Sequence, residues 1–431
     1  MTTINKELFS ADKLGIYLHI PFCVQKCAYC DFTSFGGASE EEQERYVRGL
    51  IREIREYGAG GETGQVRDES GPADGRPEPA GTAEDEGPAG TAEDEGPAGP
   101  GIRGYLAESV FFGGGTPSLL EPHLIESLLA ELKNVFRVSG EAEITLEANP
   151  GTLSAEKLAA YRRMGINRLS MGVQSMDDGI LRTLGRIHDR KTVLENWRQA
   201  RSAGFDNINL DLMFGVPEQR LEDWEKTLSE ILALEPEHLS FYSLQIEEGT
   251  EFYRRFCSGS LSQIPEELDR RMYHTALEEL EKRGYHHYEI SNAAKPGFEC
   301  RHNLKYWSME DYLGLGLAAH SYIRGVRFCN TGDRDAYERG DRLEEVHRND
   351  RRDSISDFLF TELRLIRGIS LSEFELRYGQ PLTELFGPQV RRFTGEGLLE
   401  TEGDFLRFTK KGLDFTNTVM RELMTAGGAH E

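Results

Sequence analysis

The sequence predicts an α/β protein, with strands and helices that alternate to build one parallel sheet, followed by a smaller α+β domain. Two observations carry this prediction. Six short apolar runs, rich in β-branched and aromatic residues, alternate with helical patterns over the first part of the chain. After about Glu345 the pattern changes to several helices and a hairpin. With 431 residues, 38% of them apolar, the chain is long enough for two or three domains.

The six apolar runs are expected to be the parallel strands. Helical patterns between most of them imply parallel pairing with right-handed crossovers, in either an open sheet or a barrel-like closure. The expected strands are Gly15–Ile20, Ser109–Phe112, Glu143–Ala148, Arg168–Val173, Asn207–Met213 and Leu239–Leu244. The first helix begins at Ser39, where the letters SEEE form a capping box. Further helices are expected at Glu121–Phe136, Ser154–Met164, Lys191–Ala203 and Leu221–Leu234.

The C-terminal part resembles a small winged-helix-like module. Helical patterns at Asp357–Leu365, in SLSEFELRYG and in PLTELFGPQVRRFTGEGLL precede a hairpin with its turn at Gly403-Asp404 and a final helix. We therefore expect a first domain over residues 1–345 and a second over 346–431. Such modules bind DNA or serve as packing domains, and the acidic chain favours packing.

The net charge of −24 argues against binding to nucleic acid, because a phosphate backbone would be repelled. Part of this charge lies in residues 59–104, which hold eleven Asp or Glu against three Arg. GTAEDEGPA occurs there twice in tandem, and the segment lacks the apolar side chains that a fold requires. We expect a disordered acidic insertion, in preference to a docking segment for a basic partner.

The lack of a recognisable targeting signal and the small number of cysteines favour a cytoplasmic protein. No apolar run approaches the length of a membrane span, although peripheral association with a membrane stays open. The first residues contain no apolar segment typical of a secretory signal. Six cysteines in so long a chain do not form a disulfide scaffold, so reduced thiols are expected.

Half of the cysteines lie together, in YLHIPFCVQKCAYCDF, directly after the first strand. Cys23, Cys27 and Cys30 are spaced C-x3-C-x2-C, with polar residues between them that indicate a loop. A tetrahedral zinc site needs four ligands, and the nearest fourth candidate, His19, lies within the strand pattern. Three thiolates on a four-iron cluster would instead leave one iron open for a small molecule.

Polar residues and glycines also collect where the other strands end. In parallel α/β folds the carboxyl ends of strands share one edge, so these residues are expected to meet one ligand. FFGGGTPS supplies a glycine turn whose N–H groups could form a nest for a polar ligand. Strand ends or the loops that follow them supply Glu147, Gln174, Arg186 and Asp211.

The cysteine spacing after a first strand resembles the signature of the radical S-adenosylmethionine (SAM) superfamily. That resemblance implies a [4Fe-4S] cluster on Cys23, Cys27 and Cys30, whose open iron binds the amine and carboxylate of SAM. It also implies reductive cleavage of SAM to a 5′-deoxyadenosyl radical, with an electron donor as partner. The fold it implies is a partial (β/α)6 barrel, which agrees with the six expected strands.

Within the superfamily, the chain resembles the oxygen-independent coproporphyrinogen III oxidase-like branch, from about Gly15 to the C-terminus and outside the acidic insertion. The phrases YLHIPFC, FGGGTPS, EANPGT, GVQS and LGRIH carry this resemblance. The SAM contacts that it implies are Tyr17, Gly114, Gly115, Thr116, Glu147, Gln174, Arg186 and Asp211.

Two departures argue against coproporphyrinogen decarboxylation. The oxidases of this branch have a further cysteine two positions after the third ligand, where this chain has Phe32. They also have a long segment before the first strand, where this sequence has sixteen residues before Tyr17. Activity as an enzyme therefore stays open.

The segment ECRHNLKYW resembles the H-N-x-x-Y-W motif of the haem-chaperone subfamily (HemW-type) of this branch. It offers Cys300 or His302 as an axial ligand and Tyr306 and Trp307 as flat partners for a macrocycle. The structural alternative is a buried His–Asn hydrogen-bond pair with two core aromatics.

The resemblance implies a haem chaperone that holds a [4Fe-4S] cluster, SAM and haem and delivers haem to a haem-requiring respiratory protein. The alternative is an oxygen-independent coproporphyrinogen III oxidase of porphyrin metabolism. A methyltransferase-like relative and a DNA-binding regulator are less favoured.

Overall fold

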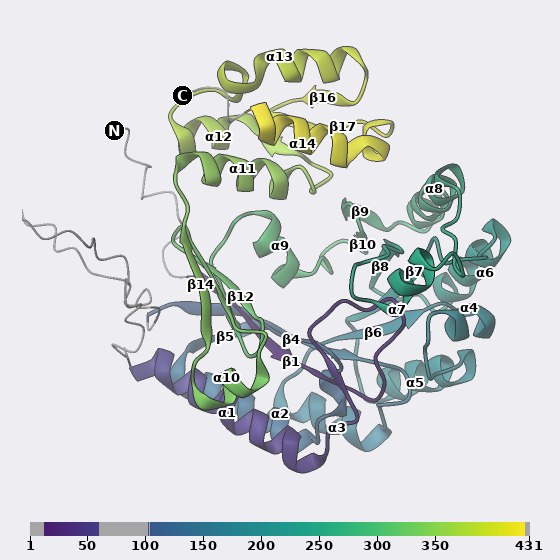
Figure 1. Ribbon diagram of the computed structural model, residues 1–431, viewed down its shortest axis with the longest axis vertical. Coiled ribbons are helices and arrows are strands. Elements are labelled where there is room, and N and C mark those ends of the chain that lie inside the picture. The colour runs from purple at the N-terminus through teal and green to yellow at the C-terminus, as the bar shows by residue number, and fades with distance from the viewer. Residues whose placement is uncertain (1–12, 60–101, 103, 427–431) are drawn as a thin grey trace, which may run out of the picture.

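The computed structural model describes residues 13–59, 102 and 104–426, and its centre is one twelve-stranded sheet (Figure 1). Six neighbouring strands of this sheet run parallel and follow chain order. All six predicted strands are confirmed, with boundaries shifted by a few residues. They are β1 (Lys13–Ile20), β4 (Leu106–Gly114), β5 (Arg137–Ala148), β6 (Arg168–Gln174), β7 (Ile208–Phe214) and β8 (His238–Ser243).

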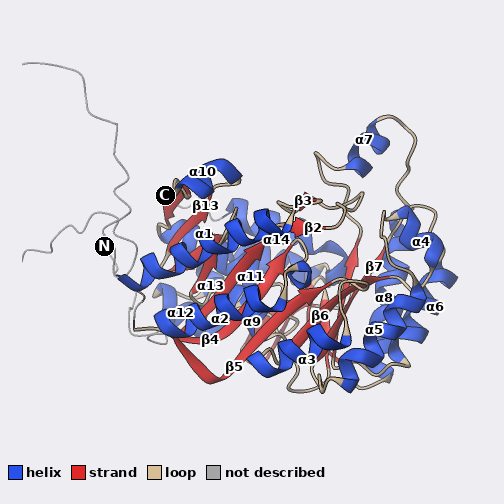
Figure 2. Ribbon diagram, turned by 90° about the horizontal axis from the view of Figure 1, so that it is seen from below, coloured by secondary structure: helices blue, strands red, loops and turns tan. Residues whose placement is uncertain are grey.

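The predicted helices cover one face of the sheet (Figures 1 and 2). They are α1 (Glu40–Ala59), α2 (Pro122–Val135), α3 (Ala155–Met164), α5 (Arg190–Ser202) and α6 (Leu221–Leu232). Three further helices were not predicted: α4 (Asp178–Thr183), α7 (Glu251–Cys257) and α8 (Glu266–Lys282). The predicted capping box at α1 is formed, because the Ser39 N–H donates to Glu42 Oε2 at 2.9 Å and Glu42 N–H to Ser39 Oγ at 3.3 Å.

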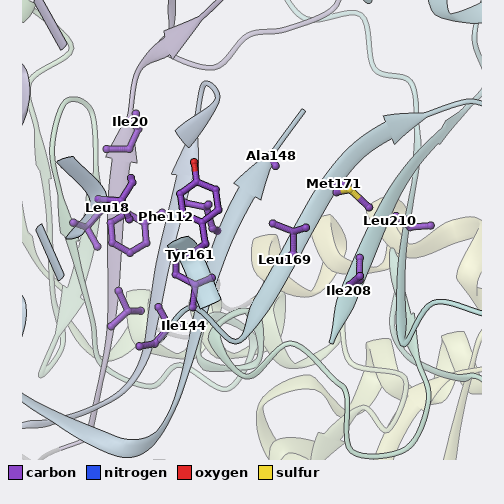
Figure 3. Close-up of a cluster of buried hydrophobic side chains, with 14 of the residues drawn as sticks. Leu18, Ile20, Phe112, Ile144, Ala148, Tyr161, Leu169, Met171, Ile208 and Leu210 are labelled. Atoms are coloured by element: carbon purple, nitrogen blue, oxygen red, sulfur yellow. The ribbon is translucent and has the colours of Figure 1, made fainter. Parts of the chain in front are cut away.

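Alternate residues of each strand point to opposite faces, which separates the core from the site. Leu18, Phe112, Ile144 and Leu169 belong to the main apolar cluster, which Figure 3 shows on successive strands. The residues between them, such as Tyr17 and Glu147, therefore line the inner, concave side of the sheet. The polar side chains of successive strands therefore lie together on the concave side of the sheet.

The sheet is a partial barrel, because β1 and β8 do not pair with each other. Beyond β1 it continues through β11 (Tyr312–Leu315), β12 (His320–Ile323), β13 (Val326–Asn330) and β14 (Leu343–Arg348). Beyond β8 it continues through β10 (Asn292–Ala294) and β9 (His286–Glu289). The pattern analysis did not predict these six short strands. The architecture is the partial (β/α)6 barrel that the family resemblance implied.

The C-terminal elements also follow the prediction. They are α11 (Arg351–Glu362), α12 (Leu371–Tyr378), α13 (Leu382–Gly395) and α14 (Thr416–Ala426), with a three-stranded sheet of β15 (Ile369–Ser370), β17 (Phe405–Phe408) and β16 (Leu399–Glu402). Their buried side chains form a second apolar cluster, which also includes Met309 and Tyr322. The expected boundary at residue 345 falls inside β14, and the short helices α9 (Arg301–Trp307) and α10 (Arg334–Arg339) precede it.

Most of the expected acidic insertion at 59–104 lies outside the described residues. Ala59 ends α1, and Ile102 is buried in the main core. Within the described ranges, no helix is both long and apolar enough to cross a membrane.

Candidate functional site

The three clustered cysteines lie on a loop that leaves the carboxyl end of β1. The short strands β2 (Phe22–Cys23) and β3 (Phe35–Gly36) pair with each other and hold the two ends of this loop together. Its middle is anchored at Ala28, whose N–H donates to the Leu184 carbonyl at 3.1 Å. All three thiols are free and partly exposed. The loop is therefore fixed in place while its sulfur atoms stay accessible.

The donors around the loop fit an iron–sulfur cluster. Among the described residues, no three His, Cys, Asp or Glu side chains converge closely enough to hold a single metal ion. The three free thiols come from one loop, and each could bind a different iron atom of one cluster. Thr116 Oγ1 donates to Cys23 Sγ at 3.7 Å, and Arg186 Nη1 donates to Cys27 Sγ at 3.5 Å. Two of the three sulfur atoms thus accept a hydrogen bond from a polar side chain beside the loop.

Arg186 connects the cysteine loop to the strand ends. Its Nη2 donates to the Gly172 carbonyl at 2.6 Å and to Asn149 Oδ1, and Asn149 Nδ2 donates to Thr116 Oγ1 at 2.7 Å. Cys27, Thr116, Asn149 and Arg186 line one opening of about 320 Å³, including its solvent-open space. The pattern analysis missed Asn149, although it stands in the phrase EANPGT that drew attention to Glu147.

The glycine turn after β4 is needed for packing. A Cβ at Gly115 would lie 2.7 Å from the Phe22 carbonyl oxygen, and Gly114 has a φ of +110° that only glycine adopts easily. The Gly114 N–H donates to Glu147 Oε2 at 3.1 Å, and the Gly115 N–H donates to the Ile20 carbonyl at 2.8 Å. These two N–H groups therefore do not form the expected free nest, because protein oxygens already accept from them.

Two buried carboxyl groups, Glu147 and Asp211, lie near enough in the barrel interior to interact electrostatically. Burial and the nearby Asp211 raise the pKa of Glu147 to about 8. Burial also raises the pKa of Asp211, although it accepts hydrogen bonds from Asn209 Nδ2 at 2.8 Å and Ser170 Oγ at 3.2 Å. A buried carboxyl pair of this kind favours a cation as its partner.

Tyr17 and Gln174 complete the set of predicted SAM contacts. The Tyr17 hydroxyl donates to His19 Nδ1 at 3.0 Å, because His19 Nε2 donates to the Thr33 carbonyl at 2.8 Å. Gln174 ends β6 with a φ of +64°, a backbone conformation that is rare outside glycine and often found at functional sites. Glu147, Gln174 and the glycine turn thus lie at the carboxyl ends of their strands, whereas Tyr17 and Asp211 lie within β1 and β7 and Arg186 follows α4.

His302, a candidate haem ligand on α9, is enclosed. Its Nδ1 lies 2.8 Å from Ser109 Oγ and its Nε2 lies 2.8 Å from the Tyr306 hydroxyl, so both ring nitrogens have partners. The Phe111 ring stacks on the imidazole at 5.2 Å between centroids. Burial, together with nearby positive charge, lowers the pKa of His302 to about 3. The histidine therefore resembles the structural alternative, with Ser109 and Tyr306 in place of an asparagine.

Cys300 is likewise shut away from solvent. It precedes α9 with no exposed surface, and its Sγ lies 3.7 Å from Glu143 Oε1. Burial raises the pKa of its thiol to about 12. Tyr306 packs edge-on against Tyr312 at 4.5 Å, and the Arg364 guanidinium lies 4.4 Å from the centre of the Trp307 ring.

A chain of buried hydrogen bonds, which sequence reasoning missed, joins α9 to Asp211. The Cys300 N–H donates to the Tyr288 hydroxyl at 3.3 Å, which lies 2.8 Å from His238 Nε2. His238 Nδ1 lies 2.6 Å from Asn209 Oδ1, and Asn209 donates to Asp211. No local pattern links these residues, because they come from separate strands and loops.

Comparison with known proteins decides the family. Residues 100–231 match the Radical SAM superfamily, and residues 349–415 match the HemN C-terminal domain. Heme chaperone HemW of Bacillus subtilis (strain 168) is 35% identical over 94% of this chain and 97% of its own length. This chain belongs to the heme chaperone HemW family. The HemW of Escherichia coli (strain K12) is 32% identical over 94% of this chain and 97% of its own.

The fold of this HemW family member is also that of a solved structure, coproporphyrinogen III oxidase (HemN) from Escherichia coli. The TM-score is 0.77 over 96% of this chain and 90% of that chain, at 21% sequence identity. At this identity the likeness shows the fold alone. The family confirms the superfamily, branch and subfamily that the cysteine spacing and the H-N-x-x-Y-W segment indicated.

Proposed function

We propose that this protein is a cytoplasmic haem chaperone that holds a [4Fe-4S] cluster and SAM, binds haem and delivers it to haem-requiring respiratory proteins. The observation that carries the proposal is the fixed loop of three accessible thiols at the mouth of a partial barrel, in a chain similar over almost its whole length to curated heme chaperones. Cys23, Cys27 and Cys30 would hold the cluster.

The strand ends would hold SAM against that cluster. Glu147 and Asp211 offer carboxyl oxygens to its amine, and Arg186 and Thr116 stand between the cysteine loop and the strand ends. Tyr17, Gly114, Gly115 and Gln174 would complete the binding surface. When an electron donor reduces it, a bound [4Fe-4S] cluster supplies one-electron chemistry to the ligand on its open iron.

Tyr306 and Trp307 are proposed as the parts of α9 that contact haem. Both residues are partly exposed, and a flat macrocycle would contact the ring surface that Arg364 and Tyr312 leave uncovered. Ligation of iron by Cys300 or His302 would require α9 to move, because both side chains are enclosed.

An anaerobic haem titration of the reconstituted full-length protein tests the proposal. We expect saturable binding of haem, followed by the change in its absorbance, and iron and sulfide bound to the same preparation. If no haem binds to the wild-type protein, the chaperone proposal fails.

An activity assay of the same preparation distinguishes a chaperone from a coproporphyrinogen III oxidase. Phe32, at the position of the further cysteine in oxidases, lies on the cysteine loop with 63% of its surface exposed. We expect no conversion of coproporphyrinogen III and no release of 5′-deoxyadenosine in an anaerobic assay with SAM and reductant. Formation of protoporphyrinogen would instead establish the oxidase activity.

A further inference from the structure

Asn149, which directly follows β5, is held by a tight turn. Its carbonyl accepts hydrogen bonds from the Thr152 N–H at 3.0 Å and from Thr152 Oγ1 at 2.7 Å, which close the turn Asn-Pro-Gly-Thr. Pro150 and Gly151, which has a φ of +91°, stand at the positions that a type II turn favours. Asn196 Oδ1 accepts from the Gly151 N–H at 2.7 Å and anchors the turn to α5. The Asn149 side chain therefore projects from a backbone that several hydrogen bonds hold in place.

The amide of Asn149 links two side chains that reach different cysteines. Its Oδ1 accepts from Arg186 Nη2, and Arg186 Nη1 donates to Cys27 Sγ at 3.5 Å. Its Nδ2 donates to Thr116 Oγ1 at 2.7 Å, and Thr116 Oγ1 donates to Cys23 Sγ at 3.7 Å. One continuous set of hydrogen bonds thus joins the guanidinium group to the two sulfur atoms.

An amide at this position gives the set of hydrogen bonds its direction. A guanidinium group only donates, so the atom that faces it must accept, and Asn149 Oδ1 does so. The Asn149 amide hydrogen then occupies the oxygen of Thr116, whose own hydroxyl hydrogen points at Cys23. A carboxylate in place of the amide would accept from both neighbours and draw the hydroxyl hydrogen away from the sulfur. Gly172 leaves room for the amide, because a Cβ there would lie 2.7 Å from Asn149 Oδ1.

We propose that Asn149 is a positioning residue that sets the reduction potential of the cluster on Cys23, Cys27 and Cys30. This role rests on the proposed function, in which these three thiolates bind the cluster. Hydrogen bonds to the sulfur atoms are among the properties that set the potential of an iron–sulfur cluster, because each donor stabilises the more negative reduced state. Asn149 orients the donors to two of the three sulfur atoms, so it should make the cluster easier to reduce.

Reduction potentials of the anaerobically reconstituted full-length protein, measured without SAM, test this role. Electron paramagnetic resonance follows the signal of the reduced cluster at a series of set potentials. Asn149→Asp is nearly isosteric and should shift the equilibrium toward the oxidised cluster by about tenfold, which equals about 59 mV for a one-electron couple. Iron and sulfide contents should match those of the wild type, because all three cysteines remain.

A double-mutant cycle separates the orientation of the hydroxyl group from the charge of the new carboxylate. Thr116→Val removes the hydroxyl group, so Asn149→Asp in that background reports the added charge without it. Asn149→Asp should therefore shift the potential further in the wild-type background than in the Thr116→Val background. Asn134→Asp is the control, because it adds the same charge at an exposed position just before the start of β5, at the other end of that strand. Its potential should match that of the wild type.

The outcomes separate this role from the proposed function. If the wild type incorporates no iron and sulfide, the role of Asn149 and the cluster assignment both fail. If the wild type holds a cluster but Asn149→Asp shifts its potential equally in both backgrounds, or not at all, the role is overturned and the cluster assignment stands. Loss of iron from Asn149→Asp would show that the residue supports the loop itself, which also overturns the role. A smaller shift in the Thr116→Val background, with iron content unchanged, supports it.

Discussion

Glu147 holds a proton at neutral pH in the folded chain. Its pKa of about 8 lies above the ordinary value of 4.5, because burial and Asp211 disfavour its negative charge. A positive charge bound nearby, such as the sulfonium group of SAM, would reverse this balance and favour the ionised carboxylate. The Glu147 carboxyl group should therefore lose its proton when a cation binds beside it.

SAM binding should therefore release protons. At pH 7, calorimetric titration in two buffers of different ionisation enthalpy should show net proton release, and SAM affinity should rise as pH approaches 8. Glu147→Gln should bind more weakly and abolish most of the release. An equal release from the variant would contradict the assignment of the amine to Glu147.

The imidazole of His302 is held by two hydroxyl groups, which indicates a structural role. Replacing it with alanine leaves a cavity and removes the partners of Ser109 and Tyr306. His302→Ala should lower the free energy of unfolding by about 2–4 kcal/mol in urea denaturation, whereas the exposed His286→Ala should change it little. A stable His302→Ala protein that no longer binds haem would instead identify an iron ligand.

Residue chemistry at the strand ends could be predicted, but the connections between residues could not. Glu147 and Asp211 stand out in sequence because a charged residue ends or interrupts an apolar strand, and Arg186 stands out in the phrase LGRIH. Asn209, His238 and Tyr288 carry no such signal. Their hydrogen bonds depend on which strands become neighbours, and this is known only once the sheet is formed.

The cysteine loop carries the three thiols that are proposed as cluster ligands, and the other cysteines lie elsewhere in the chain. Replacing Cys23, Cys27 and Cys30 together with alanine should abolish iron and sulfide incorporation after anaerobic reconstitution, because these are the only three thiols on the loop.

The remaining cysteines provide controls for that experiment. Cys257 is exposed on α7 and Cys329 is buried in β13, so neither thiol belongs to the cysteine loop itself. Their alanine variants should keep normal iron and sulfide. Equal loss of iron in these variants would show that the loop is not the cluster site.

The long elements were predictable from periodicity, and the short ones were not. The strands β1 and β4 to β8 are recognisable as largely apolar runs, although polar residues such as Asp211 interrupt some of them. Strands β9 to β14 have three to six residues and pair mostly antiparallel at the edges of the sheet, where no periodic pattern builds up. Family resemblance, not periodicity, distinguished the partial barrel from an open sheet.

At the scale of the whole molecule, Arg364 joins the C-terminal domain to the barrel. Its Nη2 lies 3.3 Å from Glu289 Oε2, a fully buried carboxylate, and its guanidinium covers Trp307 of α9. Backbone bonds from Ile290 to the Arg364 carbonyl and from Ile366 to the Tyr288 carbonyl, both 3.0 Å, flank this contact.

Removing this charge should destabilise the joint. Arg364→Gln leaves Glu289 buried without its cation and should lower the free energy of unfolding by about 3–5 kcal/mol. The exposed Arg348→Gln serves as the control in urea denaturation, because Arg348 forms no ion pair or side-chain hydrogen bond among the described residues. A change smaller than about 1 kcal/mol would show that the joint does not depend on this pair.

The central claim, delivery of haem, is tested most directly by transfer from the haem-loaded protein to haem-depleted respiratory membranes. The account predicts that recovery of haem-dependent respiration follows the loss of haem from the protein, and that it is faster than with the same concentration of free haem. A loaded protein that retains its haem, or that performs no better than free haem, would contradict the account.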